Sequence, residues 1–142
     1  MNVSEIMTGK VITVRQDEPV MAAVRLLKHH NVGALPVTDR TGRLRGLVTD
    51  RDIVLRCVAA GDDARTVPVS EIMSRGILTA QPGDTVAQAA ASMAREQIRR
   101  LPVTENDRVV GMVSLCDLAR REDCRQEYAK AAEGISANLR MR

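Results

Sequence analysis

The stretch GLVTDRD, residues 46–52, returns in altered form as GMVSLCD, residues 111–117. In each copy, apolar residues lead into a hydroxyl residue, Thr49 or Ser114, and an aspartate follows three positions later. A hydroxyl residue three positions before an acid is a variant of the capping box that begins many helices. One copy would predict only a helix start. Two copies in matched surroundings also raise the hypothesis that each helix start holds a ligand.

The duplication extends over most of the chain. VSEIM occurs at residues 3–7 and 69–73, and LPVT occurs at residues 35–38 and 101–104. The copies are offset by about 66 residues early in the unit and about 65 late in it, so one residue is lost in a turn, where chains tolerate loss. Three matched phrases in the same order indicate a repeated structural unit.

The first part of each copy predicts a short extended run followed by a helix. SEIM is typical of a brief helical turn, and residues 11–14 and 77–80 are extended runs rich in β-branched residues. In the first copy Asp17 is the expected N-cap of the helix, with Glu18 and Pro19 in its first turn. In the second copy the helix is expected to follow Asp84-Thr85.

The second part of each copy predicts a hairpin and another helix. LPVT is typical of a strand, in which Pro36 and Pro102 indicate strand starts or exposed edges. Residues 41–42 and 106–107 predict the hairpin turns. A helix follows each hydroxyl cap, so the order is β-α-β-β-α, taken twice.

These elements predict an α+β fold. The boundaries are a first repeat at 1–58, a linker at 59–68, a second repeat at 69–122 and a helical tail at 123–142, broken or frayed near Gly134. A unit of about 55 residues with one short sheet cannot bury both of its faces alone. We therefore expect the two repeats to pack sheet to sheet about a pseudo-twofold axis.

Composition narrows the classes of function. The chain of 142 residues has no Trp, no Phe and a single Tyr, so the stacking surface that single-stranded nucleic-acid binders use is missing. The net charge of +3 falls short of the dense basic stripe of a duplex-binding domain. Nucleic-acid binding, suggested only by the pI of about 9.1 and the Arg-rich segments, is therefore the weakest alternative. A membrane is not an expected partner either, since no apolar run of 18 residues exists.

The N-terminus and the cysteines point to a cytoplasmic location. MNVSEIMTGK lacks the charged and apolar regions of a signal peptide. The three cysteines are odd in number and show no C-x-x-C spacing, which argues against a disulfide framework or a zinc site. We expect reduced thiols in a cytoplasmic protein.

The doubled pattern resembles the cystathionine β-synthase (CBS) domain, whose tandem pair is called a Bateman module. The residues that carry the resemblance are the β-branched run, the helix, the LPV strand and the closing G-hydrophobic-Val-[Thr/Ser]-x-x-Asp phrase, and it covers residues 3–122. The resemblance implies ligand binding rather than chemistry. Such pairs sense adenosine-containing molecules: AMP, ADP, ATP, S-adenosylmethionine, NAD or cyclic dinucleotides, in clefts between the two sheets.

The resemblance also implies roles for individual residues. Asp52 and Asp117 would accept hydrogen bonds from ribose hydroxyls, with Thr49 and Ser114 facing phosphate or ribose. A carboxylate suits this role because it only accepts hydrogen bonds and can hold two vicinal hydroxyls at once. The residues expected to line the adenine and the strands beside it are Thr13, Val14, Val32, Ala34, Pro36, Thr79, Ala80, Ile98 and Pro102. For Val32 and Ile98 a place in the core is an equal alternative.

Three arginines complete the predicted site. Arg99 and Arg100 stand where some AMP-sensing members carry basic residues that reach phosphate oxygens, and a planar guanidinium suits phosphate. The first copy has Gly33 and Ala34 at these places, so we expect the two sites to differ in phosphate affinity. Which site the arginines serve is open, and a solvated arginine pair is the alternative. Arg51 is a further candidate.

The sequence thus predicts a small regulatory module that is not an enzyme and needs no obligatory cofactor. No acid–base pair, metal cluster or activated nucleophile is evident in it. Family analogy predicts a homodimer, with an unknown effector protein as a further partner. The alternative is a structural or protein-interaction dimer whose clefts stay empty.

Overall fold

The computed structural model describes residues 1–140, the last three of them without their side chains, and the chain forms two compact units. The first-repeat unit consists of Ile12–Ile77 together with Asp107–Val109. The second-repeat unit consists of Met1–Val11, Leu78–Asn106 and the chain from Val110 onward. Each repeat's opening segment therefore belongs to the unit built around the other repeat.

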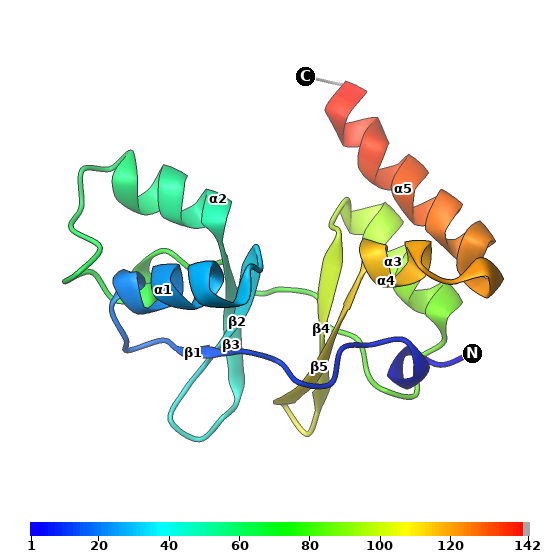
Figure 1. Cartoon of the computed structure of the whole chain (residues 1–142), viewed down its shortest axis with the longest axis horizontal. Helices are drawn as coiled ribbons and strands as arrows, with labels where there is room; N and C mark the ends of the chain where they lie inside the picture. Colours follow the sequence, from blue (N-terminus) through cyan, green and yellow to red (C-terminus); the bar gives the residue numbers. More distant parts are fainter. Residues whose placement is uncertain (141–142) are drawn as a thin grey trace. The chain divides into compact units, whose positions relative to one another are not determined.

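The first-repeat unit is a small sheet with helices on one face (Figure 1). Its strands follow the order β1-β2-β3, with β1 parallel and β3 antiparallel to the central β2. The elements in chain order are β1 (Val14–Arg15), α1 (Val20–His30), β2 (Ala34–Thr38), β3 (Leu44–Thr49), α2 (Asp50–Ile53), the π-helix η2 (Val54–Val58) and the 3-10 helix η3 (Val69–Glu71).

The second-repeat unit repeats this plan and adds a long C-terminal helix (Figure 1). Its two-stranded sheet pairs β4 with β5, and Ala80 forms a single parallel bridge to Val103 where the first unit has β1. The elements are η1 (Val3–Glu5), α3 (Val86–Glu96), β4 (Arg100–Glu105), β5 (Arg108–Ser114), α4 (Leu115–Ala119), η4 (Glu122–Cys124) and α5 (Arg125–Arg140). The first two residues of β5 count with the first-repeat unit.

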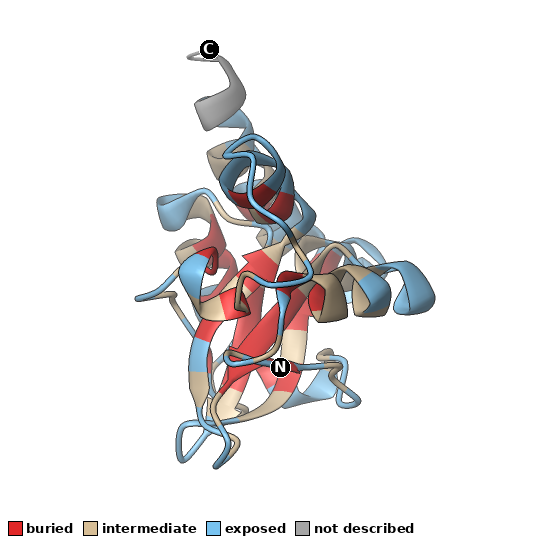
Figure 2. Ribbon diagram, turned by 90° about the vertical axis from the view of Figure 1, so that its left-hand side faces the viewer, coloured by how far each residue is buried: buried red, intermediate tan, exposed pale blue. Residues whose placement is uncertain are grey.

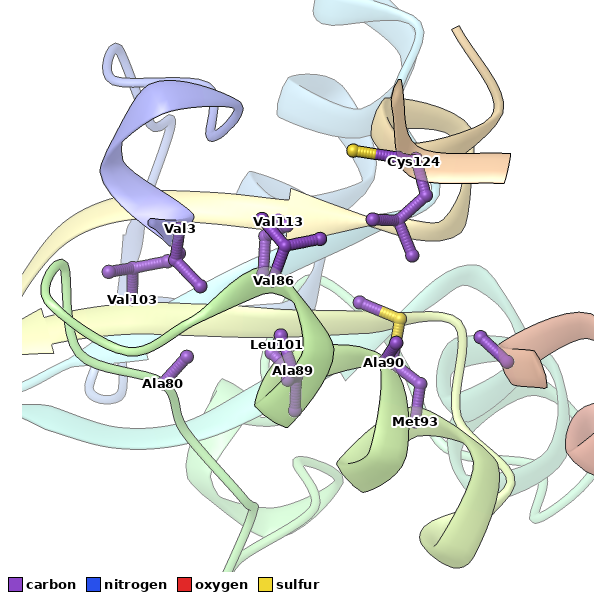
Figure 3. Packing of buried hydrophobic residues seen from close by; sticks show 12 residues of the cluster. Val3, Ala80, Val86, Ala89, Ala90, Met93, Leu101, Val103, Val113 and Cys124 are labelled. Atoms are coloured by element: carbon purple, nitrogen blue, oxygen red, sulfur yellow. The ribbon is translucent and has the colours of Figure 1, made fainter. Parts of the chain in front are cut away.

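Each unit has its own aliphatic core, as a chain without Phe or Trp requires. The buried residues gather in the strands and on the helix faces turned toward them (Figure 2). In the second-repeat unit, Ala90 and Met93 of α3 pack against Leu101 of β4 and Val113 of β5 (Figure 3). Burial of a Val, Leu or Met side chain stabilises the fold by about 1.5–3 kcal/mol.

The opening segments help to close these cores. Val69, Ile72 and Met73 are buried in the core of the first-repeat unit. The Val69 N–H donates to the Glu18 carbonyl at 2.8 Å. The opening segment of the second repeat is therefore attached to the first-repeat unit by a backbone hydrogen bond as well as by side-chain packing. In the second-repeat unit Val3 is fully buried, and its N–H donates to the Asp84 carbonyl at 2.8 Å.

The predicted β-α-β-β-α order is confirmed, although the first strand of each repeat is shorter than expected. Within the run 11–14 only Val14 belongs to a strand, and in the run 77–80 only Ala80 pairs. The chain passes from one unit to the other between Val11 and Ile12 and between Ile77 and Leu78. Most of each run therefore connects the units and does not extend a sheet.

The two strand prolines lie inside their strands and not at strand starts. The prediction of an edge was wrong for Pro36, because β2 is the central strand of its sheet, whereas β4 with Pro102 lies at an edge of its two-stranded sheet. Pro36 is the third residue of the central strand β2 and Pro102 the third residue of β4, and both are buried. The Pro102 carbonyl accepts from the Ala80 N–H at 2.9 Å. The N and O atoms of one residue point to the same side of a strand. The missing N–H of Pro102 therefore faces the side on which β4 pairs only through the bridge between Ala80 and Val103, so little pairing is lost.

The start of the first long helix follows its prediction in one repeat only. Thr85 is the N-cap of α3, and its side chain accepts from the Gln88 N–H, as Asp84-Thr85 indicated. In the first repeat the expected N-cap Asp17 was wrong, because α1 begins at Val20 with Pro19 as N-cap. Asp17 instead pairs with Arg15 and Arg40 on the surface, and these cations lower the pKa of its carboxyl.

Helix α5 runs from Arg125 to Arg140 without a break at Gly134, so the predicted break there was wrong. Helix α5 packs across α3 and α4, and a Cβ on Gly134 would lie 2.6 Å from Ala94 Cα. The glycine therefore permits a close approach of two helices and does not end one. The side chain of Leu139 and residues 141–142 of the predicted tail lie outside the described part. No helix in residues 1–140 has the length and apolar character needed to cross a membrane.

The glycine of each closing phrase allows two backbones to meet. A Cβ on Gly46 would lie 2.5 Å from the Ser74 carbonyl oxygen, and one on Gly111 would lie 2.5 Å from Met7 Sδ and 3.0 Å from the Thr8 oxygen. Leu47 and Ser74 exchange two backbone hydrogen bonds of 3.0 and 2.8 Å beside this contact. Gly46 faces a fixed backbone atom, whereas Gly111 faces chiefly a flexible side chain.

We expect Gly46→Ala to lower the free energy of unfolding by about 2 kcal/mol or more, because a methyl group there forces the backbone apart. Gly111→Ala should be milder. Gly83→Ala is the control, since a Cβ there meets nothing within 4 Å. Urea denaturation of the three variants measures the order, and a Gly46→Ala protein as stable as the control would contradict the close contact.

Candidate functional site

The start of α2 commits one oxygen of Asp52 to the protein itself. Asp52 Oδ2 accepts the Thr49 N–H at 2.9 Å, and the Asp52 N–H donates to Thr49 Oγ1 at 3.1 Å. These reciprocal bonds form the capping box that the sequence indicated. The second oxygen, Oδ1, takes no part in the cap and lies 3.9 Å from Arg56 Nε.

The start of α4 has the same arrangement. Asp117 Oδ2 accepts from the Ser114 N–H at 2.7 Å and from the Ser114 hydroxyl at 3.1 Å. The Asp117 N–H lies 3.3 Å from Ser114 Oγ, and Asp117 Oδ1 lies 3.9 Å from Arg120 Nη1. In both repeats, therefore, one oxygen of the aspartate belongs to the helix cap. The other oxygen lies 3.9 Å from an arginine side chain.

Neither aspartate is sealed from solvent. The side chains of Asp52 and Asp117 keep 13% and 11% of their surface exposed. A distance of 3.9 Å is too long for a hydrogen bond, so each Oδ1 retains its acceptor capacity. The capping interpretation is confirmed, and it leaves one carboxylate oxygen in each repeat able to accept from a bound molecule.

In the first repeat the chain before β2 lies against the aspartate's helix. The Asp50 N–H donates to the Gly33 carbonyl at 3.1 Å, and Ala34 is directly opposite Thr49 in the antiparallel pair β2–β3. Val32, one residue earlier, is 42% exposed and is thus not a core residue. The predicted residues Val32, Ala34, Thr49 and Asp52 therefore belong to one neighbourhood.

The second repeat places its arginines at the equivalent point. The Leu115 N–H donates to the Arg99 carbonyl at 2.8 Å, which matches the bond between Asp50 and Gly33. Arg99 and Arg100 therefore lie beside the helix start of their own repeat, Arg99 exposed and Arg100 half-buried. Ile98, the counterpart of Val32, is half-buried and packs against the core.

Other predicted residues have buried side chains. Val14 and Ala80 are 1% and 3% exposed, and Pro36 and Pro102 are buried as well. Any contact of these four with a ligand would pass through backbone atoms. Their neighbours Thr13 and Thr79 are exposed, as is Arg51, the second residue of α2.

Two arginines beside the aspartates were missed at the sequence level. Arg56 follows Asp52 by four residues and Arg120 follows Asp117 by three, which is the spacing of ion pairs on a helix. Arg56 Nη1 also donates to the carbonyls of Ile72 and Met73, at 3.2 and 3.3 Å. The helical spacing was a usable signal for the ion pairs, but the carbonyl contacts depend on a segment 16 residues away.

The buried cysteines contribute little chemistry. Burial raises the pKa of the Cys57 thiol, with the charges of Asp62 and Asp63 adding to the effect. Burial likewise raises the pKa of Cys124. A raised pKa favours the thiol over the reactive thiolate.

The family model of the CBS domain matches residues 3–58 and 69–123. The CBS domain-containing protein YhcV of Bacillus subtilis is 42% identical over 135 residues, 95% of each chain. Hypoxic response protein 1 of Mycobacterium tuberculosis is 35% identical over 116 residues, 82% of this chain and 81% of the relative.

Solved structures agree with the sequence relatives. Hypoxic Response Protein I with two coordinated zinc ions superposes with a TM-score of 0.79 at 34% identity, over 85% of this chain and 98% of that one. The CBS domain pair of protein MJ0100, in complex with 5′-methylthioadenosine and S-adenosyl-L-methionine, gives 0.76 at 31% identity, over 84% and 94%. This chain is a tandem pair of CBS domains and belongs to that family.

We expect Thr49→Ala and Ser114→Ala each to lower the free energy of unfolding by about 1 kcal/mol, because each removes the acceptor that begins a helix. Thr49→Ser keeps the oxygen and should restore most of the loss. Thr85→Ala, which removes the equivalent cap of α3, is a matched control with the same expected loss. Thermal unfolding of the four variants measures these values; an unchanged Thr49→Ala protein would mean that the cap contributes nothing.

Proposed function

We propose that this CBS pair is a regulatory module that binds an adenosine-containing ligand through Asp52 and Asp117. The observation that carries the proposal is the division of each carboxylate. One oxygen holds the helix start, while the other remains an acceptor at a partly exposed position. A fixed acceptor-only group is suited to the two adjacent hydroxyls of a ribose.

The surroundings of each aspartate support a nucleoside. In the first repeat the exposed side chain of Val32 supplies an apolar surface for a base, close to the strand that ends at Thr49. In the second repeat Arg99 and Arg100 supply positive charge that the first repeat lacks there, which favours a phosphorylated ligand. The two repeats would then differ in the ligand that they prefer.

The relatives support the ligand class without choosing its member. The MJ0100 pair is a 31% identical neighbour whose complex contains two adenosine compounds. AMP, ADP, ATP, S-adenosylmethionine and NAD all carry the ribose diol that the carboxylates would bind, and all remain candidates. No obligatory cofactor and no enzymatic step form part of the proposal. A cytoplasmic location and an effector protein that responds to the ligand stay predictions, as does the sheet-to-sheet packing of the repeats.

We further propose that the chain forms a homodimer through an apolar helix face of the first-repeat unit. Val54, Leu55 and Val58 of η2 are 54%, 51% and 64% exposed. In the second-repeat unit α5 packs on α3 and α4. The same three side chains are the observation that favours the alternative function, a dimer module that works without ligand.

We expect Asp52→Ala and Asp117→Ala each to weaken binding at one site by about 100-fold, because hydrogen bonds to a charged acceptor contribute about 1.5–3 kcal/mol each. Isothermal calorimetry with AMP, ADP, ATP, S-adenosylmethionine and NAD measures the affinities. Gln88→Ala, which removes the acid-free capping box of α3, is the control for lost stability alone. Unaltered binding in both aspartate variants, or no binding at millimolar ligand in the folded protein, would refute the proposed function.

We expect Leu55→Glu to convert the dimer to a monomer, because it places a charge in the apolar face. Light scattering coupled to size-exclusion chromatography measures the mass. Tyr128→Glu changes an exposed apolar residue of α5 and should leave the dimer intact. A monomer in the Tyr128 variant and a dimer in the Leu55 variant would move the interface to α5. A dimer that persists equally with and without nucleotide would favour the ligand-free alternative only if calorimetry also shows no binding.

A further inference from the structure

Arg56 connects the aspartate of the first repeat to a distant part of the backbone. Its Nε lies 3.9 Å from Asp52 Oδ1, while its Nη1 donates to the carbonyls of Ile72 and Met73. These carbonyls follow the 3-10 helix η3, where backbone acceptors lack partners within the helix. The Arg56 guanidinium therefore donates to backbone carbonyls at the end of η3, and these hydrogen bonds hold the guanidinium in place.

The backbone that holds Arg56 is itself attached to the strand that leads to the site. The Ser74 N–H donates to the Leu47 carbonyl at 2.8 Å, and the Leu47 N–H donates back to Ser74 at 3.0 Å. Leu47 precedes Thr49 by two residues on β3. Arg56, the 72–74 segment and β3 thus form a closed set of contacts around the Asp52 carboxylate.

The second repeat lacks this set of contacts. Arg120 approaches Asp117 at the same 3.9 Å, but its side chain is 77% exposed, against 52% for Arg56. Among the side chains that the structure describes, Arg120 donates no hydrogen bond to a backbone carbonyl, so its position is not fixed in the way that of Arg56 is. Two carboxylates with the same cap therefore differ in how firmly their outer oxygen is oriented.

We propose that Arg56 is a positioning residue for ligand binding in the first repeat: it fixes the orientation of the Asp52 carboxylate so that Oδ1 is directed at the ribose diol before the ligand arrives. The inference rests on the proposed function of Asp52. At 3.9 Å Arg56 orients Oδ1 by its charge without using the oxygen's acceptor capacity. A group that is already oriented loses less entropy on binding, which raises affinity.

A purely structural role for Arg56 predicts something different. If the side chain only joins η2 to the segment after η3, its loss would weaken every ligand of the first repeat alike. A positioning role restricts the loss to ligands with ribose hydroxyls. Comparing AMP and ATP with their 2′,3′-dideoxy analogues separates the two roles, because the analogues differ only in the hydroxyls that Asp52 would bind.

The experiment measures the first repeat alone, in an Asp117→Ala background, by calorimetry with these four nucleotides. Arg56→Gln should weaken AMP or ATP about 5- to 10-fold and leave the dideoxy analogues within about twofold, as expected for a partly exposed ion pair with neighbouring hydrogen bonds. Adding Asp52→Asn should then produce no further loss from Arg56→Gln. Arg56→Lys keeps the charge and should recover part of the affinity; it also serves if Arg56→Gln does not fold.

The matched control is Arg120→Gln in an Asp52→Ala background, where the ribose-dependent loss should stay below about twofold, because Arg120 has no such anchor. If Asp52→Ala still weakens binding about 100-fold, then equal losses for the ribose and dideoxy ligands, or unchanged affinity in Arg56→Gln, would overturn the positioning role alone. If Asp52→Ala itself had no effect in the same background, the proposed function and this inference would both be wrong.

Discussion

The hydrogen bond between the Thr49 N–H and Asp52 Oδ2, repeated between Ser114 and Asp117, is the interaction around which each repeat is arranged. It turns the chain from a strand into a helix at a fixed point. It also holds one carboxylate oxygen in the cap and leaves the other beside an arginine side chain. The helix start is therefore the first constraint on each carboxylate, and a neighbouring charge such as that of Arg56 can add a second.

The duplication makes the two candidate sites comparable, and the differences between them lie in particular residues. The first has the anchored Arg56 and an exposed Val32, while the second has Arg99 and Arg100 beside its helix start. Their outer faces differ too, because α5 covers α3 whereas the apolar side chains of η2 are exposed. The chain has thus kept one shared cap and changed the residues around it.

Features determined by neighbouring residues were predictable from the sequence. The capping boxes, the hairpin turns and the start of α3 depend on contacts a few residues apart. Features that depend on distant neighbours were not. Gly134 looked like a helix break because its reason, Ala94 of α3, lies 40 residues away in the sequence. Pro36 and the carbonyl contacts of Arg56 escaped prediction for the same reason.

The exchange of opening segments means that the two repeats cannot be separated without loss to both cores. Val3 completes the core built from the second half of the chain, and Val69, Ile72 and Met73 complete the core built from the first half. A chain cut midway would leave each half with the opening segment that completes the core of the other half. Each half would lack the segment that completes its own core. Neither half of the chain therefore carries all the residues of its own core.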